Sequence, residues 1–254
     1  MRDIQKALKE HKQAVLNYGI KEEQLLVVAL YGSQNYGLVT ENSDVDTKAI
    51  YIPTLEELCS APKPLVKELS LPNNEKCVLM DIRHFADNLK KQNLNYVEIL
   101  FTDYYLVVNK DLEFAWTYLR DIREQVAFYD PNKAVLSMAH QAKHTLHQDP
   151  FDKSKYARSL FLSKFLHTYM EAVEFNDELT YMEALHQPPH VIEEILNLKT
   201  GKVEYTYEDT YNLRKRFTDL TEMNPYPVNA EHQEKVDKAL LCIIVGAVRA
   251  FDFY

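Results

Sequence analysis

Residues 31–53 of the chain read YGSQNYGLVTENSDVDTKAIYIP. Two of the five glycines, Gly32 and Gly37, are followed here by two carboxylates, Asp44 and Asp46. Successive side chains of a β-strand point to opposite faces, so acids separated by one residue share a face, with Cα atoms about 6.5–7 Å apart. The stretch therefore predicts a glycine-containing turn and then a strand that begins with paired carboxylates.

The sequence on either side of this stretch indicates a sheet. Residues 25–32, LLVVALYG, form a nearly continuous apolar run, which is typical of a strand buried on both faces. Residues 44–53, DVDTKAIYIP, alternate polar and apolar side chains and end at a proline, which cannot continue a central ladder. Residues 77–82, CVLMDI, and 104–108, YYLVV, predict two further strands.

Helical periods lie around these strands and dominate the second half of the chain. An N-terminal helix is expected over about residues 2–17, ending before Gly19, a residue suited to a C-terminal cap. Shorter helices are expected near residues 84–93 and 95–101. Long helical periods follow over residues 132–148, 153–175, 190–198, 207–220 and 232–251.

Length and composition agree with a folded protein of two domains. The chain has 254 residues, of which 46% are apolar and 26% charged, close to the averages of globular proteins. We predict an α+β fold, in which a mixed sheet with flanking helices spans residues 1–109 and a helical domain spans residues 110–254.

Cysteine spacing and hydropathy favour the cytoplasm. The three cysteines are odd in number and lack a C-x-x-C spacing, so neither a disulfide framework nor a zinc site is indicated. The N-terminus is charged and helix-patterned, and no stretch approaches the roughly 18 apolar residues of a membrane span. We therefore expect a cytoplasmic protein without a membrane segment.

The formal net charge of −9 argues against sequence-independent adhesion to nucleic acid, which depends on many contacts between basic side chains and phosphates. A local basic groove stays open, although solvated helix faces are the simpler interpretation of both basic clusters. These clusters are Lys153, Lys155, Arg158 and Lys164, and Arg214, Lys215 and Arg216.

The opening stretch has the residue types of a metal and phosphate site. Two neighbouring carboxylates repel each other unless a cation neutralises them, and Mg²⁺ is commonly bound by one or two carboxylates plus substrate phosphates. Gly32 lets a phosphate approach the backbone, and Ser33 offers a hydroxyl and an N–H. Asp81 stands in the apolar run VLMDI and is a candidate third carboxylate, since an acid in such surroundings needs a partner.

These residues resemble the nucleotidyltransferases of the DNA polymerase beta superfamily, whose signature is G-S followed by D-x-D and a later carboxylate. The closer similarity is to predicted bacterial and phage nucleotidyltransferases of the YcgL type, related to an RNA-repair-linked branch. The similar stretches are GSQNYGL (32–38), ENSDVDTKAIYIP (41–53), DIRHFADNLKKQNLNYVEILF (81–101) and KYARSLFLSKFLHTYMEA (155–172).

The resemblance implies Mg²⁺- or Mn²⁺-dependent transfer of a nucleoside monophosphate from a nucleoside triphosphate to an acceptor. Gly32 and Ser33 would hold the β- and γ-phosphates, and Asp44 and Asp46 would ligate two metal ions. Asp81 would ligate the metal that activates the acceptor hydroxyl.

The same resemblance leaves some assignments less defined. It places Lys155 and Arg158 as contacts of the triphosphate or the acceptor. The acceptor, whether an RNA end, a protein or a small molecule, stays open, and so does the oligomeric state.

Three alternatives remain beside this interpretation. A catalytically silent binding module of the same fold would be marked by loss of a carboxylate or of the G-S pair. A metal-dependent phosphohydrolase would need a further His/Asp cluster, which the sequence does not offer. His140, His144 and His147 share one helical face and could bind a transition metal, but no acidic or thiol partner is evident nearby, and we prefer a polar helix face or a cleft lining.

Overall fold

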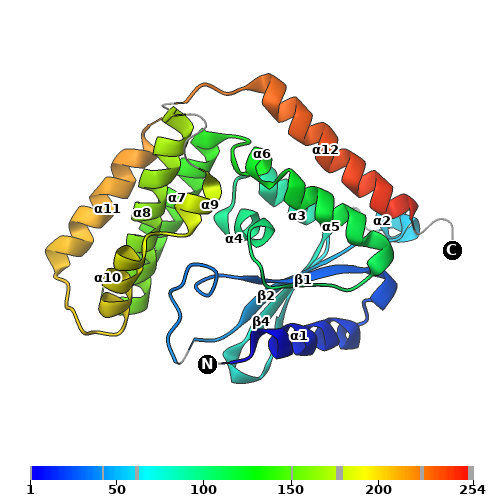
Figure 1. The fold of residues 1–254 in the computed structure, drawn as a ribbon, viewed down its shortest axis with the longest axis horizontal. Helices are drawn as coiled ribbons and strands as arrows, with labels where there is room; N and C mark the ends of the chain where they lie inside the picture. Colours follow the sequence, from blue (N-terminus) through cyan, green and yellow to red (C-terminus); the bar gives the residue numbers. More distant parts are fainter. Residues whose placement is uncertain are drawn as a thin grey trace.

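The computed structural model of the protein describes residues 2–41, 43–60, 63–149, 151–175, 180–223 and 226–250. Its centre is a mixed sheet in the order β3-β4-β2-β1-β5, in which β2 and β4 are parallel and the other neighbours antiparallel (Figure 1). The strands are β1 (Leu25–Tyr31), β2 (Asp46–Tyr51), β3 (Val66–Ser70), β4 (Lys76–Asp81) and β5 (Tyr105–Val107).

Helices surround this sheet and form the rest of the described chain. They are α1 (Ile4–Tyr18), α2 (Leu55–Ser60), α3 (Ile82–Lys90), α4 (Leu94–Val97), α5 (Glu113–Asp121), α6 (Arg123–Ala127), α7 (Pro131–Gln148), α8 (Lys153–Phe175), α9 (Tyr181–Leu185), α10 (Pro189–Lys199), α11 (Tyr207–Thr221) and α12 (Ala230–Arg249). Short 3-10 helices lie at Glu22–Gln24, Pro72–Asn74, Glu98–Leu100 and Lys110–Leu112.

The predicted α+β fold is confirmed. The four strands expected from the sequence correspond to β1, β2, β4 and β5, and the described chain after Lys110 is helical wherever it is regular. The missed strand, β3, is an edge strand whose residues VKELS are mostly exposed, so it carries no alternating apolar pattern.

The two faces of the sheet are covered differently. Val28, Ala49 and Leu79 pack with α1 on one face, and Ile50 and Met80 pack into the larger core on the other. The larger core contains side chains of α3 and α5 and extends into the helical half. Because side chains alternate along β2, Asp46 shares the face of Ile50 rather than that of Ala49.

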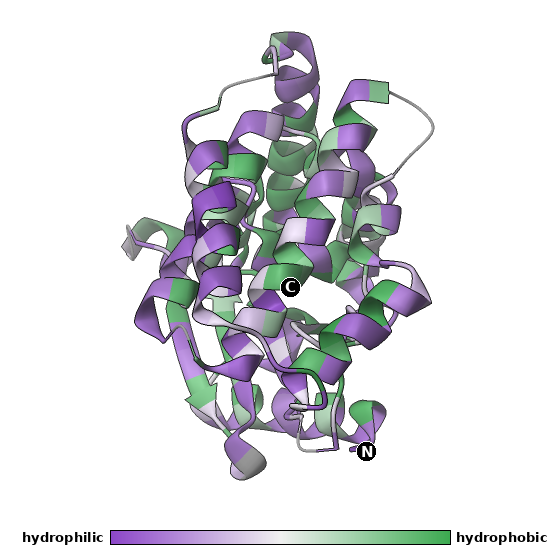
Figure 2. Cartoon of the chain, turned by 90° about the vertical axis from the view of Figure 1, so that its left-hand side faces the viewer, coloured by the Kyte–Doolittle hydropathy of each residue, from purple (hydrophilic) through white to green (hydrophobic). Residues whose placement is uncertain are grey.

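The helices of the second half form a bundle beside the sheet, apart from α12. Helix α7 packs against α8 and α11, and α10 packs against α8. Figure 2 views the molecule from this side, and hydrophobic stretches are concentrated on the helices behind the outer, more hydrophilic ones. Helix α12 instead runs back along α5, α3 and α6 (Figure 1).

The domain boundary near residue 109 stays a prediction. The larger core is continuous across it, since one cluster of buried side chains includes Leu26 of β1 and Val248 of α12.

In the part of the chain that the structure describes, no helix is long and apolar enough to cross a membrane.

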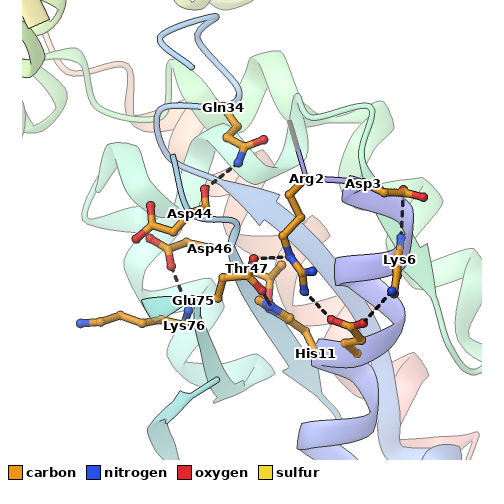
Figure 3. Close-up of polar contacts among 11 residues, drawn as sticks. Arg2, Asp3, Lys6, His11, Gln34, Asp44, Asp46, Thr47, Glu75 and Lys76 are labelled. Carbon is orange, nitrogen blue, oxygen red and sulfur yellow. Dashed lines mark hydrogen bonds and ion pairs between the residues drawn. The ribbon is translucent and has the colours of Figure 1, made fainter. Parts of the chain in front are cut away.

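A buried polar network fastens α1 to the start of β2. His11 Nδ1 lies 2.7 Å from Thr47 Oγ1, and His11 Nε2 lies 3.1 Å from Glu75 Oε2 (Figure 3). Arg2 also forms an ion pair with Glu75. A neutral imidazole satisfies both contacts, because Nε2–H donates to the carboxylate and Nδ1 accepts from the hydroxyl. The network therefore fixes Thr47, the neighbour of Asp46, from the α1 side.

Asp81 ends β4 and caps α3. Its fully buried carboxylate accepts hydrogen bonds from the Arg83 backbone N–H at 2.7 Å and from Arg83 Nε at 2.9 Å and Nη2 at 2.5 Å. An N-cap acid paired with a guanidinium is stable in apolar surroundings, because its charge is hydrogen-bonded. These contacts supply the partner that the acid in VLMDI requires.

The expectation that Asp81 lies beside Asp44 and Asp46 is wrong. Strand β4 runs parallel to β2, so Asp81, at its C-terminal end, pairs with Tyr51. The step from Asp46 to Tyr51 along β2 is about 16 Å at about 3.3 Å per residue. Tyr51 also belongs to the core on the α1 face, opposite the face of Asp46.

Protonation of His11 should destabilise the protein. Burial lowers the pKa of His11 below its usual 6.5, although Glu75 opposes the shift. The unfolded chain then binds more protons, so the free energy of unfolding should fall as pH drops from about 7 through 6.5 and below. Urea unfolding of wild type and His11→Gln at several pH values measures this slope.

The His11→Gln variant should have a flatter pH dependence than wild type. His190→Gln, which changes an exposed histidine of α10, is the matched control and should keep the wild-type slope. Equal slopes in wild type and His11→Gln would contradict the prediction.

Asp81→Asn should lower stability. An asparagine still caps a helix but cannot pair ionically with Arg83, so we expect a loss of about 1–3 kcal/mol in the free energy of unfolding. Asp87→Asn, on the exposed side of α3, is the control and should change stability little. An Asp81→Asn protein as stable as wild type would refute the capping role.

Candidate functional site

A cleft of about 750 Å³ lies between the sheet and the helical half. It is lined by Tyr31, Gly32, Ser33, Tyr36, Leu38, Thr40, Ser43, Asp46, Asn95, Ser154, Ala157, Arg158, Lys199 and Thr200. Residues distant in sequence therefore meet there, from the end of β1, the start of β2, α4, α8 and α10. A smaller cavity of about 470 Å³, lined by Phe128, Val173 and Pro227 among others, includes none of the predicted site residues.

The G-S turn follows directly from β1. Gly32 has φ +90°, a left-handed conformation that side chains with a Cβ rarely adopt. The turn is closed by Asn35 N–H donating to Gly32 O at 2.9 Å and by Leu38 N–H donating to Ser33 O at 3.0 Å. The glycine is therefore required by the backbone geometry.

The N–H of Gly32 points into the protein. It donates to both carboxylate oxygens of Glu98, each at 3.2 Å, and Glu98 is fully buried. Its N–H is thus directed to a carboxylate rather than offered to a phosphate. Ser33 lines the cleft, and neither its N–H nor its hydroxyl bonds to any other described residue.

Asp46 lines the cleft, and Asp44 lies beside it. Figure 3 shows their carboxylates side by side, with Gln34 Nε2 donating to Asp44 O at 2.6 Å. Strand β2 begins at Asp46, so the exposed Asp44 precedes the strand rather than opening it. Burial, and then the charge of Asp44, raise the pKa of Asp46 to about 6. Burial and the neighbouring charge of Asp44 thus both disfavour the ionised form of Asp46.

The position on β4 beside Asp46 is occupied by a lysine. Lys76 precedes Cys77, which pairs with Thr47, and its backbone N–H donates to Asp46 Oδ1 at 3.0 Å. Its ammonium forms an ion pair of 3.0 Å with Glu68 on β3. Hence no third carboxylate joins Asp44 and Asp46 from this strand.

Among the described residues, Asp44 and Asp46 are the pair whose fit to a metal ion can be considered at this cleft. In the described part of the chain, no three His, Cys, Asp or Glu side chains are grouped so as to hold a metal ion. This includes His140, His144 and His147, all three of which are exposed on α7. The oxygen donors of Asp44 and Asp46 still fit Mg²⁺, which commonly takes one or two carboxylates and completes its shell with water and substrate phosphates.

Of the two basic residues implied by the resemblance, the structure brings only Arg158 to the cleft. Ser154, Ala157 and Arg158 are spaced three and four residues apart on α8 and form its lining face. Arg158 Nη2 donates to Asn95 Oδ1 at 3.0 Å. Lys155 is about 100° round the helix from Ser154, outside this face.

Two further lysines in or beside the cleft were not identified from the sequence. Lys199 Nζ donates to Leu38 O at 2.6 Å, which ties the loop after the G-S turn to α10, and burial lowers its pKa. Lys48 is only 3% exposed, and its Nζ lies 3.3 Å from the centroid of the Tyr31 ring. A signal for Lys48 existed, because it has the same strand parity as Asp44 and Asp46.

Known proteins are similar to this chain in two comparisons. The chain is similar to a solved nucleotidyltransferase-like protein from Exiguobacterium sibiricum 255-15, with 16% identity and a TM-score of 0.31 over 98% of this chain and 75% of that one. No curated protein matches. Residues 1–240 match the family described as RlaP, RNA repair pathway DNA polymerase beta family. This match covers nearly the whole chain and confirms the resemblance drawn from the motifs, so the protein belongs to the RNA repair pathway DNA polymerase beta family.

Proposed function

We propose that the protein transfers a nucleoside monophosphate from a nucleoside triphosphate to an acceptor, with Mg²⁺ or Mn²⁺ bound by Asp44 and Asp46. The observation that carries the proposal is the meeting of three groups at one cleft. These are the acid pair, the unbonded N–H and hydroxyl of Ser33, and the guanidinium of Arg158. Phosphoryl-type transfer depends mainly on positioning and charge neutralisation, which these groups can supply.

The side chains have distinct tasks in this proposal. When bound, the cation would neutralise charge on the phosphates and on the oxygens that attack and leave. Ser33 donates to phosphate oxygens through its N–H and hydroxyl, and Arg158 offers a planar pair of donors suited to phosphate. Lys199, by holding Leu38, keeps the loop that carries Ser33 against the helical half.

The donor set favours one protein-held cation over two. Asp44 and Asp46 can share an ion with the triphosphate, but a second ion would need another ligand near Asp46. The neighbouring β4 position is Lys76, and the acid nearest to it, Glu68, is paired with that lysine. We therefore propose that nucleotide phosphates supply most of the remaining ligands.

The family description gives the first acceptor to test. It refers to RNA repair, so we propose an RNA end as the acceptor, with protein and small-molecule hydroxyls as the alternatives. Lys76 also favours a second candidate, a member that binds nucleotide without transferring it, since a cation occupies the strand position beside Asp46.

Nucleotide binding should require a divalent cation and Asp46. Isothermal titration calorimetry with ATP, GTP, CTP and UTP, with and without Mg²⁺, measures it. We expect Asp46→Asn to weaken binding in Mg²⁺ about tenfold or more, equivalent to about 1.4 kcal/mol, because a charged ligand is lost. Asp121→Asn, an exposed acid of α5, is the control.

Absence of binding by every nucleotide at millimolar concentration in Mg²⁺ would remove the basis of the proposal. Incubation with labelled nucleotides and RNA, protein or small-molecule acceptors separates the two candidates. Labelled acceptor identifies a transferase, and binding without labelling identifies the silent module.

Arg158→Ala and Lys155→Ala should behave differently. Loss of a hydrogen bond to a charged phosphate costs about 1.5–3 kcal/mol, so Arg158→Ala should weaken triphosphate binding by roughly 10–150-fold. Lys155→Ala should leave the affinity within about twofold, because Lys155 lies outside the lining face of α8. Equal losses of triphosphate affinity in the two variants would contradict the assignment of Arg158, and not Lys155, to the face of α8 that lines the cleft.

A further inference from the structure

The G-S turn is anchored by an acid that comes from another part of the chain. Glu98, in the 3-10 helix Glu98–Leu100, accepts from Gly32 N–H through both carboxylate oxygens, and the Asn35 amide lies 3.5 Å from Oε2. Asn35 is itself held, since its amide donates to Leu30 O at 3.1 Å and Thr102 Oγ1 donates to its Oδ1 at 2.8 Å. A buried polar cluster therefore lies directly beneath the turn.

An ordinary turn does not need such an anchor. Backbone hydrogen bonds already close this one, and burying a carboxylate costs several kcal/mol unless it is compensated. The anchored N–H immediately precedes Ser33, whose own donors are unbonded among described residues. Movement of Gly32 would displace those donors directly, so the costly contact serves the position of Ser33.

A positive charge near Glu98 is that of Lys48 on β2, the strand that begins at Asp46. Lys48 on β2 is 97% shielded from solvent, at 3% exposure, and its Nζ contacts the rings of Tyr31 at 3.3 Å and Tyr96 at 4.8 Å from their centroids. In the described ranges no oxygen accepts a hydrogen bond from it. The attraction between a cation and two aromatic rings is smaller than the cost of burying the cation alone.

The buried ammonium of Lys48 is therefore stabilised by the charges of neighbouring acids. Glu98 and Asp46 both act on it favourably, and Arg158 acts unfavourably. Because β1 and β2 pair with Tyr31 opposite Asp46, the turn after β1 and the acid at the start of β2 are already adjacent. Lys48 thus lies in the same buried region as Glu98, on the strand of the cation-binding pair.

We propose that Glu98 and Lys48 are positioning residues for nucleotide binding: Glu98 fixes Ser33 by holding Gly32 N–H, and Lys48 balances the charges of Glu98 and Asp46. This inference rests on the proposed function for its substrate. In this inference neither Glu98 nor Lys48 touches the nucleotide, and both act through the G-S turn and the acid pair.

Variants of Glu98 test the hydrogen bond separately from the charge. Glu98→Leu removes the acceptor for Gly32 N–H and should raise the Kd for triphosphate in Mg²⁺ about tenfold or more. Glu98→Gln keeps a carbonyl oxygen that accepts from Gly32 and should stay within about threefold of wild type. Gln92→Leu, a buried polar residue bonded to Leu89 O and Val126 O, should lower Tm with no change in Kd.

Lys48→Met tests the charge. It removes one of the two cations, Lys48 and Arg158, that act favourably on the Glu98 carboxylate, and should weaken triphosphate binding. The double variant Glu98→Gln with Lys48→Met should bind more tightly than Lys48→Met alone. If the two changes are simply additive, the charge role of Lys48 is wrong. If Glu98→Leu lowers Tm as Gln92→Leu does and leaves Kd unchanged, the positioning role of Glu98 is wrong.

Hydrogen exchange separates failure of this inference from failure of the proposed function, because it needs no ligand. The amide of Gly32 should exchange slowly in wild type and Glu98→Gln, and faster in Glu98→Leu even if Glu98→Leu is too unstable for calorimetry. Unchanged protection in Glu98→Leu would overturn the inference. If wild type binds no nucleotide but its Gly32 amide is protected and loses that protection in Glu98→Leu, the anchor is supported and only the function is refuted.

Discussion

The antiparallel pairing of β1 with β2 is the constraint on which the site depends. Its register sets Tyr31 opposite Asp46, so the turn that leaves β1 and the acid that opens β2 meet at one edge of the sheet. Side-chain alternation then assigns Asp46, Lys48 and Ile50 to the face that the helical half covers. A slip of one residue would move both charged side chains to the α1 face.

Charged groups inside this fold are compensated in three different ways. Asp81 is hydrogen-bonded by the guanidinium and N–H of Arg83, and Glu75 is paired with Arg2 and His11. Each of these two carboxylates is therefore paired with a guanidinium. Lys48, beneath the cleft, has aromatic rings and distant carboxylates instead. Lys48 therefore differs from Asp81 and Glu75, because it has no hydrogen-bonded partner of opposite charge among the described residues.

Periodicity was enough to predict the central strands, the long helices and the α+β class, because buried runs and amphipathic helices have regular patterns. The same information misplaced Asp81, since an apolar context is common to a capping acid and a metal ligand. What decides between them is the direction of β4 relative to β2, which is a tertiary property. Glu98 gave no signal at all, as its contact with Gly32 spans 66 positions. Lys48 had a signal in its parity with Asp46, but a lysine within a strand is usually exposed.

The path of α12 has a consequence for the order in which the protein is completed during synthesis. This helix packs on α5, α3 and α6, which lie beside the sheet. Helices α7 to α11 separate α12 from these three helices in the sequence. While the ribosome is still making the bundle, the apolar side chains of α5 that α12 will cover face solvent. Nascent chains usually fold from the N-terminus onward, but here α5, α3 and α6 gain the packing of α12 only after the bundle has been made. The N-terminal half, although it is made first, thus gains part of its packing late.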